Sequence, residues 1–189
     1  MLGMKFLPSK IYHLYNQGNN KEMIFSSPTD YYSFLIKMRK HVLPVCELLA
    51  YSLMPNHFHL VIQTTLKSCE PVRLGYLTSN RLSNAIRLLL SQYCQDFNKA
   101  NNRSGSLFRQ KTKGKCLSEL KNKDAALLCV NYIHNNASTA GLVPKSADWP
   151  YCSLRDYLGV RNGTLCNKNL AFDLLGIDEI YVREMSGYY

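Results

Sequence analysis

Two neighbouring segments near the middle of the chain constrain the fold more than any other feature. Residues 45–54 are mostly apolar. In residues 57–63 the apolar side chains Phe58, Leu60 and Ile62 alternate with His57, His59, Val61 and Gln63. Only residues 55–56, Pro-Asn, lie between the two segments. Because so short a connection joins antiparallel strands, the pattern predicts a β-hairpin. Strict alternation then places His57 and His59 on one face of the second strand, opposite its apolar face.

The surrounding segments extend this hairpin into an α+β fold. Residues 10–15 are rich in strand-forming side chains, and apolar residues at helical spacing predict helices near 28–43 and 74–97. A further strand is predicted at 107–117, and a last helix runs from near 122 or 124 to 136. The order β-α-β-β-α-β-α predicts a ferredoxin-like antiparallel sheet with helices on one side.

Composition sets the expected domain organisation and location. We predict one domain over residues 1–143 and a C-terminal extension, residues 144–189, packed on it, since no linker composition separates them. No run approaches the roughly 18 apolar residues that a membrane span needs. The N-terminus turns polar too early for a secretory signal. We therefore expect a cytoplasmic protein without a membrane partner.

The net charge of +10 predicts a polyanionic partner. Between Lys99 and Lys123 eight residues are basic and only Glu119 is acidic. Such a stretch is typical of contacts to a nucleic-acid backbone, although it would also keep an exposed edge strand soluble. The candidate phosphate-binding residues within it are Arg103, Arg109, Lys111, Lys113 and Lys115.

The motif that carries chemistry is the histidine pair. Two imidazoles two residues apart on a strand can bind one metal ion, but such a pair is also an ordinary surface feature. The string from 54 to 62, Met-Pro-Asn-His-Phe-His-Leu-Val-Ile, resembles the signature of HUH nucleases, specifically the single-tyrosine REP-associated tyrosine transposases. Further matches to that family follow in the same order at residues 12–20, 105–110, 132–136, 140–143 and 149–150.

The resemblance implies a reaction and its residues. The nucleophile would be Tyr132, and the third metal ligand, an amide one helical turn later, would be Asn136. Residues four apart share one face of a helix, so both side chains could meet the two histidines. Two imidazole nitrogens and an amide oxygen suit Mg²⁺ or Mn²⁺. The implied activity is metal-dependent cutting and rejoining of single-stranded DNA through a 5′-phosphotyrosine.

The resemblance also implies a DNA partner folded into hairpins from imperfect palindromes, and we expect the protein to be a monomer or homodimer. The amide-rich loop after the first strand is the candidate reader of the single-stranded flank, through Asn16, Gln17 and Asn19. Two positions depart from the family pattern. Ala137 stands where a proline is usual, and Thr139 stands where an arginine is common.

Several alternatives stay open. Tyr76 also has an amide residue, Asn80, four positions later, near the expected start of a helix. Tyr12 and Asn16 have the same spacing on a strand, where it separates the side chains by about 13 Å. Tyr132 could instead be a buried aromatic of a hydrophobic helix. The whole protein could be a non-catalytic DNA-binding protein with the same fold, or a metal-dependent hydrolase.

Overall fold

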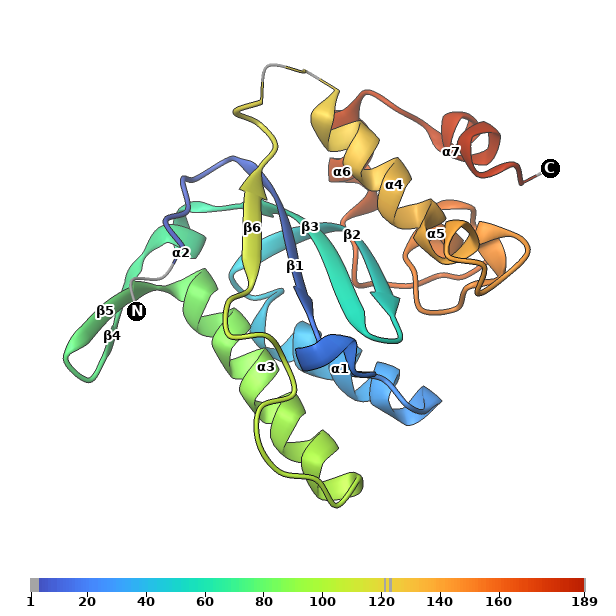
Figure 1. The fold of residues 1–189 in the computed structure, drawn as a ribbon. Coiled ribbons are helices and arrows are strands. Elements are labelled where there is room, and N and C mark those ends of the chain that lie inside the picture. Colours follow the sequence, from blue (N-terminus) through green and yellow to red (C-terminus); the bar gives the residue numbers. More distant parts are fainter. Residues whose placement is uncertain (1–3, 121, 123, 189) are drawn as a thin grey trace.

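A computed structural model describes residues 4–120, 122 and 124–188. Its main sheet is antiparallel and has the strand order β2-β3-β1-β6 (Figure 1). The four strands are β1 (Ile11–Gln17), β2 (Cys46–Met54), β3 (His57–Thr64) and β6 (Lys113–Cys116). Helices connect β1 to β2 and β3 to β6, which is the ferredoxin-like arrangement that the sequence predicts.

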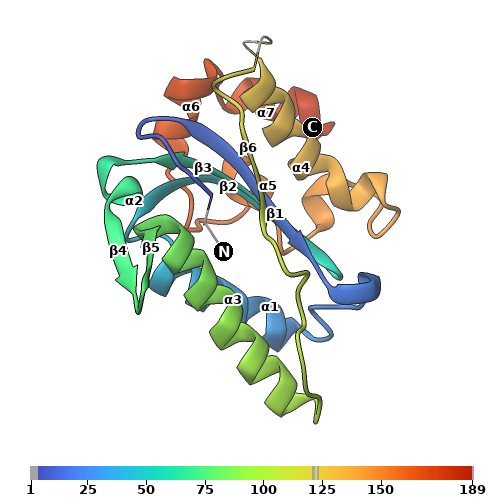
Figure 2. The same cartoon turned by 60° about the vertical axis from the view of Figure 1, so that its left-hand side comes forward.

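Two long helices, α1 (Pro28–His41) and α3 (Arg81–Ala100), lie together on one face of this sheet (Figures 1 and 2). Helix α1 begins where predicted, because the carboxylate of Asp30 accepts a hydrogen bond from the backbone N–H of Ser27 at 2.8 Å. The apolar sides of the helices and the sheet form the hydrophobic core. Its fully buried members include Leu14, Phe34, Met38, Phe58, Leu60, Leu82, Leu89 and Tyr93.

The turn between β2 and β3 is held by the rest of the chain. The carbonyl of Pro55 accepts hydrogen bonds from the backbone N–H groups of Ile24 and Phe25, at 2.8 and 3.0 Å. The carbonyl of Asn56 accepts one from Gly18 at 2.9 Å, just beyond the end of β1. These contacts fix the position at which β3, and with it the histidine pair, begins.

Helix α4 (Ala125–Thr139) lies on the opposite face of the sheet from α1 and α3 (Figure 2). The prediction of helices on one side therefore holds for the two connecting helices, while α4 packs on the face that carries the histidines. Its anchoring side chains are Val130, Ile133 and Ala137, each at most 2% exposed.

The C-terminal residues pack on the same domain. Residues 151–153 add to the free edge of β2, where the N–H of Ser153 donates to the carbonyl of Tyr51 at 2.9 Å. Beyond them the carboxylate of Asp156, 1% exposed, is bound by Arg161 at 2.6 Å. The division at residue 143 stays a prediction. The short helices of this region are η2 (Ser146–Asp148), α5 (Leu154–Tyr157), α6 (Lys168–Leu175) and α7 (Glu179–Ser186).

Two predicted elements have the wrong bounds. The helix expected from residue 74 begins at Arg81, after a hairpin of β4 (Pro71–Leu74) and β5 (Leu77–Asn80). The side chain of Asn80 caps the helix by accepting from the N–H of Ser83 at 2.8 Å, which stops it from extending backward. Two short elements, η1 (Asn19–Lys21) and α2 (Leu66–Cys69), complete this half of the chain.

The strand expected at residues 107–117 is regular only over β6. The preceding residues, 107–112, form a loop that joins the end of β1 through a single bridge between Phe108 and Gly18. None of the helices in the described part of the chain combines the length and apolar character that a membrane crossing requires.

Candidate active site

His57 opens β3 and points Nε2 toward α4. Its Nδ1 lies 2.6 Å from Oδ1 of Asn56. An amide oxygen only accepts hydrogen bonds, so His57 donates from Nδ1–H and leaves Nε2 as an unprotonated lone pair. The neighbouring residue thus sets the tautomer that a metal ion would need.

His59 lies deeper, with 6% of its surface exposed. Its Nδ1 is 2.9 Å from Nε2 of His13 on β1. Within the described chain, Nε2 of His59 and Oγ of Ser52 are the buried side-chain polar atoms that have no hydrogen-bond partner. The two residues are directly opposite each other on β3 and β2. Buried polar atoms nearly always have a hydrogen-bond partner, so these two atoms are exceptions. Nε2 of His59 is therefore a position that can bind a further polar group or ion.

The environment keeps these rings neutral. Burial, with smaller contributions from the neighbouring rings of His57 and His13, lowers the pKa of His59 to about 3. Burial, and then the charge of Lys115, lowers the pKa of His13 to about 4. Burial also lowers the pKa of His57. Neutral imidazole is the form that binds metal ions.

Helix α4 brings the two remaining candidates to the histidines. The Tyr132 ring meets His59 edge-on, with 5.7 Å between ring centroids and 84° between planes. One turn later, Nδ2 of Asn136 lies 3.5 Å from Nε2 of His57. Tyr132 is 55% exposed, so the alternative that it is a buried core aromatic is wrong. Its hydroxyl can meet a large substrate.

The four predicted groups therefore meet, and three of them fit a divalent metal ion. Nε2 of His57 carries a lone pair, and Nε2 of His59 has no hydrogen-bond partner in the described chain. The side-chain amide of Asn136 carries an oxygen as well as the nitrogen that lies near His57, so it can supply a third ligand. No cluster of three His, Cys, Asp or Glu side chains suited to a metal occurs among residues 4–120, 122 and 124–188. A metal site here would depend on the amide.

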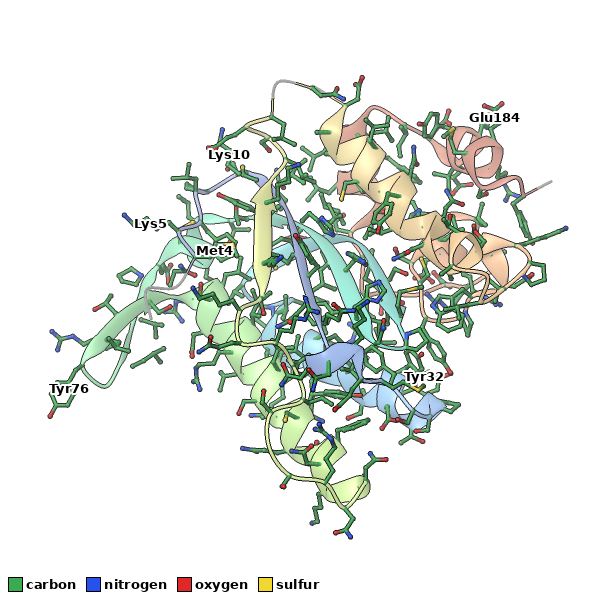
Figure 3. All side chains as sticks on the ribbon, in the orientation of Figure 1. Met4, Lys5, Lys10, Tyr32, Tyr76 and Glu184 are labelled. Carbon is green, nitrogen blue, oxygen red and sulfur yellow. The ribbon has the colours of Figure 1, made fainter. Side chains whose placement is uncertain are left out.

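The competing tyrosines lie elsewhere. Tyr76 is fully exposed at the tip of the β4–β5 hairpin, far from α4 (Figure 3). It lies between β4 and β5, before the helix begins, so it does not share a helical face with Asn80. Tyr12 is 5% exposed and packs against Phe6 on the α1–α3 side of the sheet. Of the three candidate pairs, only Tyr132 and Asn136 lie beside the histidines.

Comparison with known proteins supports the architecture. No protein-family model matches the sequence, and no curated protein matches it. Among solved structures, a REP-associated tyrosine transposase bound to a REP hairpin matches with a TM-score of 0.60. The match covers 84% of this chain and 85% of that chain, at 14% sequence identity.

The chain has the fold of a REP-associated tyrosine transposase. This confirms the fold that the motif resemblance implies. At 14% identity the match carries no residue roles across. The roles of Tyr132, His57, His59 and Asn136 are therefore argued from the geometry of this chain.

The edge strand β6 supplies basic side chains beside the site. Lys113 and Lys115 are exposed and pair with Tyr15 and His13 of β1, so they share the histidine face of the sheet. A pocket of about 420 Å³ separates β6 from α4. It is lined by His13, Lys115, Leu117, Leu120, Asn122, Ala125, Leu128, Cys129 and Tyr132.

Two other predicted phosphate contacts, Arg109 and Lys111, are exposed on the loop before β6. They line a larger pocket, about 840 Å³, against α3 and the β4–β5 hairpin. That pocket contains none of the four candidate catalytic and metal-binding residues, so its size does not make it the reaction centre. Lys121 and Lys123, which belong to the predicted basic stretch, lie outside the described residues.

Asn16 has a structural role, and Arg103 is paired with an acidic side chain. Asn16 is 4% exposed, and its amide donates to the carbonyl of Arg109 at 3.2 Å and to Thr112 at 3.1 Å. The prediction that Asn16 reads bases is therefore wrong, because it ties the loop before β6 to β1. Arg103 forms a partly exposed salt bridge with Glu22 at 2.8 Å, and its contact with DNA stays a prediction.

The other two amides of the candidate reading loop are more accessible. Gln17 lies opposite His57 and is partly exposed on the histidine face. Asn19 is also partly exposed, and its Nδ2 donates to the carbonyl of Ser106 at 3.0 Å. Their contact with bases stays a prediction.

Two further histidines lie close to the candidate site residues. No sequence motif marks His13, and its place on the histidine face follows from the register of β1 on β3, which pairs Tyr15 with His59. His134, expected to pack or to contact the DNA backbone, is 4% exposed and its Nε2 lies 2.9 Å from Oγ of Ser153. It packs, and its burial excludes a contact with DNA.

Proposed function

We propose that this protein is a metal-dependent single-stranded DNA endonuclease and strand transferase, acting on hairpin-forming DNA. One observation carries the proposal. Helix α4 places an exposed tyrosine and a buried amide, one turn apart, against two neutral imidazoles of β3. The fold match supports it, because that transposase was solved bound to a hairpin.

In the proposed reaction, the Tyr132 hydroxyl oxygen attacks a backbone phosphorus atom. A new O–P bond forms while the bond from phosphorus to the 3′-oxygen breaks. The phenol proton passes to solvent, and the leaving 3′-oxygen takes up a proton to become a hydroxyl. The product is a 5′-phosphotyrosine, which a second 3′-hydroxyl can attack to join new ends without nucleotide hydrolysis.

The remaining residues position the substrate. His57, His59 and Asn136 would hold Mg²⁺ or Mn²⁺, which neutralises charge on the phosphate when bound. Lys113 and Lys115 extend the positive surface from the site along β6 and would contact neighbouring phosphates.

The test uses a labelled pool of hairpin oligonucleotides with randomised single-stranded flanks, incubated with the protein and Mn²⁺. We expect a covalent protein–DNA adduct on a denaturing gel, which is lost in Tyr132→Phe and retained in Tyr76→Phe. The control is matched, because both substitutions remove one hydroxyl from an exposed ring, but only Tyr132 contacts His59.

The other outcomes separate the alternatives. Tight hairpin binding by the wild type without cleavage identifies a non-catalytic DNA-binding protein. Cleavage without an adduct, unchanged in Tyr132→Phe, identifies a hydrolase. An adduct that survives in Tyr132→Phe and vanishes in Tyr76→Phe overturns the assignment of the nucleophile.

A further inference from the structure

We propose that His13 is a positioning residue that sets the tautomer of His59 before a metal ion binds. This inference rests on the proposed metal site. His13 lies on β1, two residues from Tyr15, which is paired with His59 across the sheet. Its Nε2 and Nδ1 of His59 are 2.9 Å apart.

The two rings meet nitrogen to nitrogen. Their centroids are 5.0 Å apart, and their planes are inclined by 24°. Such a centroid separation, together with nitrogen atoms 2.9 Å apart, requires the two nitrogens to lie close to the line between the ring centres. The shared proton therefore lies near both ring planes, which is the geometry of a strong hydrogen bond rather than of a stacked pair.

One hydrogen bond between two neutral imidazoles allows two proton arrangements. If His13 donates, His59 must carry its own proton on Nε2, where the described chain offers this buried atom no acceptor. If His59 donates from Nδ1, its Nε2 is instead a bare lone pair. Buried N–H groups without a partner are rarer than under-used acceptors, so the second arrangement is favoured.

In the second arrangement, His13 must accept the hydrogen bond at Nε2, and its surroundings allow this. Its proton then sits on Nδ1, and its ring lines the open 420 Å³ pocket between β6 and α4, where water can accept that proton. The two proposed ligand histidines are then held in the same way. Asn56 holds Nδ1 of His57 at 2.6 Å, and His13 holds Nδ1 of His59, so that both Nε2 lone pairs are free.

The functional consequence is preorganisation of the metal ligands. Partners that bind the second nitrogen of a ligating histidine typically contribute about 10- to 100-fold to metal affinity. We expect His13→Leu, which fills similar space without an acceptor, to weaken Mn²⁺ binding by about that factor. His13→Gln should stay close to the wild type, because its amide oxygen lies as many bonds from Cβ as Nε2 of histidine does.

The first measurement needs neither metal nor substitution of His13. Two-bond ¹H–¹⁵N correlation spectra of histidine-labelled, metal-free protein report which ring nitrogen carries the proton, and His59→Gln identifies the His59 signals. We expect His59 to be protonated on Nδ1. Protonation on Nε2 overturns the proposal, whatever the variants do.

The second measurement is Mn²⁺ binding without DNA, followed by the EPR signal of the free ion. His59→Ala tests the metal site itself, and His41→Leu is the matched control, since His41 is a partly buried histidine that hydrogen-bonds Gln92 away from the site. If the wild type binds no Mn²⁺, or His59→Ala binds as well as the wild type, the proposed metal site fails. If only His59→Ala loses binding and His13→Leu does not, the role of His13 fails alone.

Discussion

His134 offers the sharpest test of how α4 is attached to the domain. The residue is 4% exposed, its Nε2 lies 2.9 Å from Oγ of Ser153, and burial lowers its pKa to about 3 from an ordinary 6.5. Ser153 in turn is bound to Tyr51 of β2 through backbone and hydroxyl groups. His134 therefore links the helix that carries Tyr132 to the edge of the sheet.

The low pKa has a calculable consequence. A group whose pKa is lower in the folded state stabilises the fold fully above its unfolded pKa, and the stabilisation is lost as the pH falls. With an unfolded pKa of 6.5, the free energy of unfolding falls by about 2 kcal/mol between about pH 8 and about pH 5 through this residue alone. The loss depends little on the folded pKa, provided that it stays well below the final pH.

The perturbation is His134→Gln, whose amide can still reach Ser153. We expect it to cost about 1 kcal/mol at about pH 8 through imperfect packing and hydrogen bonding. Because the new side chain does not titrate, the difference from the wild type should reverse sign by about pH 5, with the variant about 1 kcal/mol more stable. The other histidines titrate in both proteins and cancel.

The assay is urea unfolding in EDTA, followed by circular dichroism across this pH range. Ser153→Ala is the control, because it removes the partner but keeps the titrating ring. That variant should lose about 1–3 kcal/mol at high pH and keep the pH dependence. Parallel curves for the wild type and His134→Gln would refute the assignment of a buried, neutral His134.

Three further predictions follow from single contacts. Tyr132→Phe should change the free energy of unfolding by less than about 0.5 kcal/mol, since the ring is exposed and no hydrogen bond from its hydroxyl occurs in the described chain. A larger loss in chemical denaturation would indicate a structural role. Lys113→Ala and Lys115→Ala should each lower the slope of log affinity against log salt for hairpin binding by about one, and unchanged slopes would place the DNA elsewhere. Asp156→Ala should cost about 2–3 kcal/mol, because Arg161, which is partly exposed, and the N–H of Gly163 both lose their buried acceptor. Thermal unfolding measures this, and a loss below about 1 kcal/mol would show that the C-terminal residues contribute little to the fold.

The elements whose geometry is local could be predicted from the sequence. The short connection at residues 55–56 predicts the β2–β3 hairpin, and strict alternation predicts that His57 and His59 share a face. Helical spacing predicts that Tyr132 and Asn136 share one side of α4. These relations hold because a strand or a helix fixes the direction of each side chain with respect to its near neighbours.

The contacts that could not be predicted from the sequence join residues far apart in the chain. Asn16 looks like an exposed loop amide until its hydrogen bonds to Arg109 and Thr112, more than ninety positions away, are seen. The salt bridge of Arg103 to Glu22 likewise joins residues 81 positions apart, which no local pattern reveals. The contact of His13 with His59 needed the register of β1 on β3, which alternation alone does not set.

The charge of the candidate site bears on how it would bind a metal ion and DNA together. Among the described residues, the side chains named at the site are all neutral or basic: His13, His57, His59, Lys113, Lys115, Tyr132 and Asn136. A hard divalent cation in such a neutral donor set keeps its full charge, and the lysines of β6 add more. An anionic phosphate is the group that would balance both. If the proposed metal site holds, linkage requires that metal and DNA would each raise the affinity of the protein for the other. In the proposed function, this site of neutral and basic side chains leaves the negative charge for the DNA phosphate to supply.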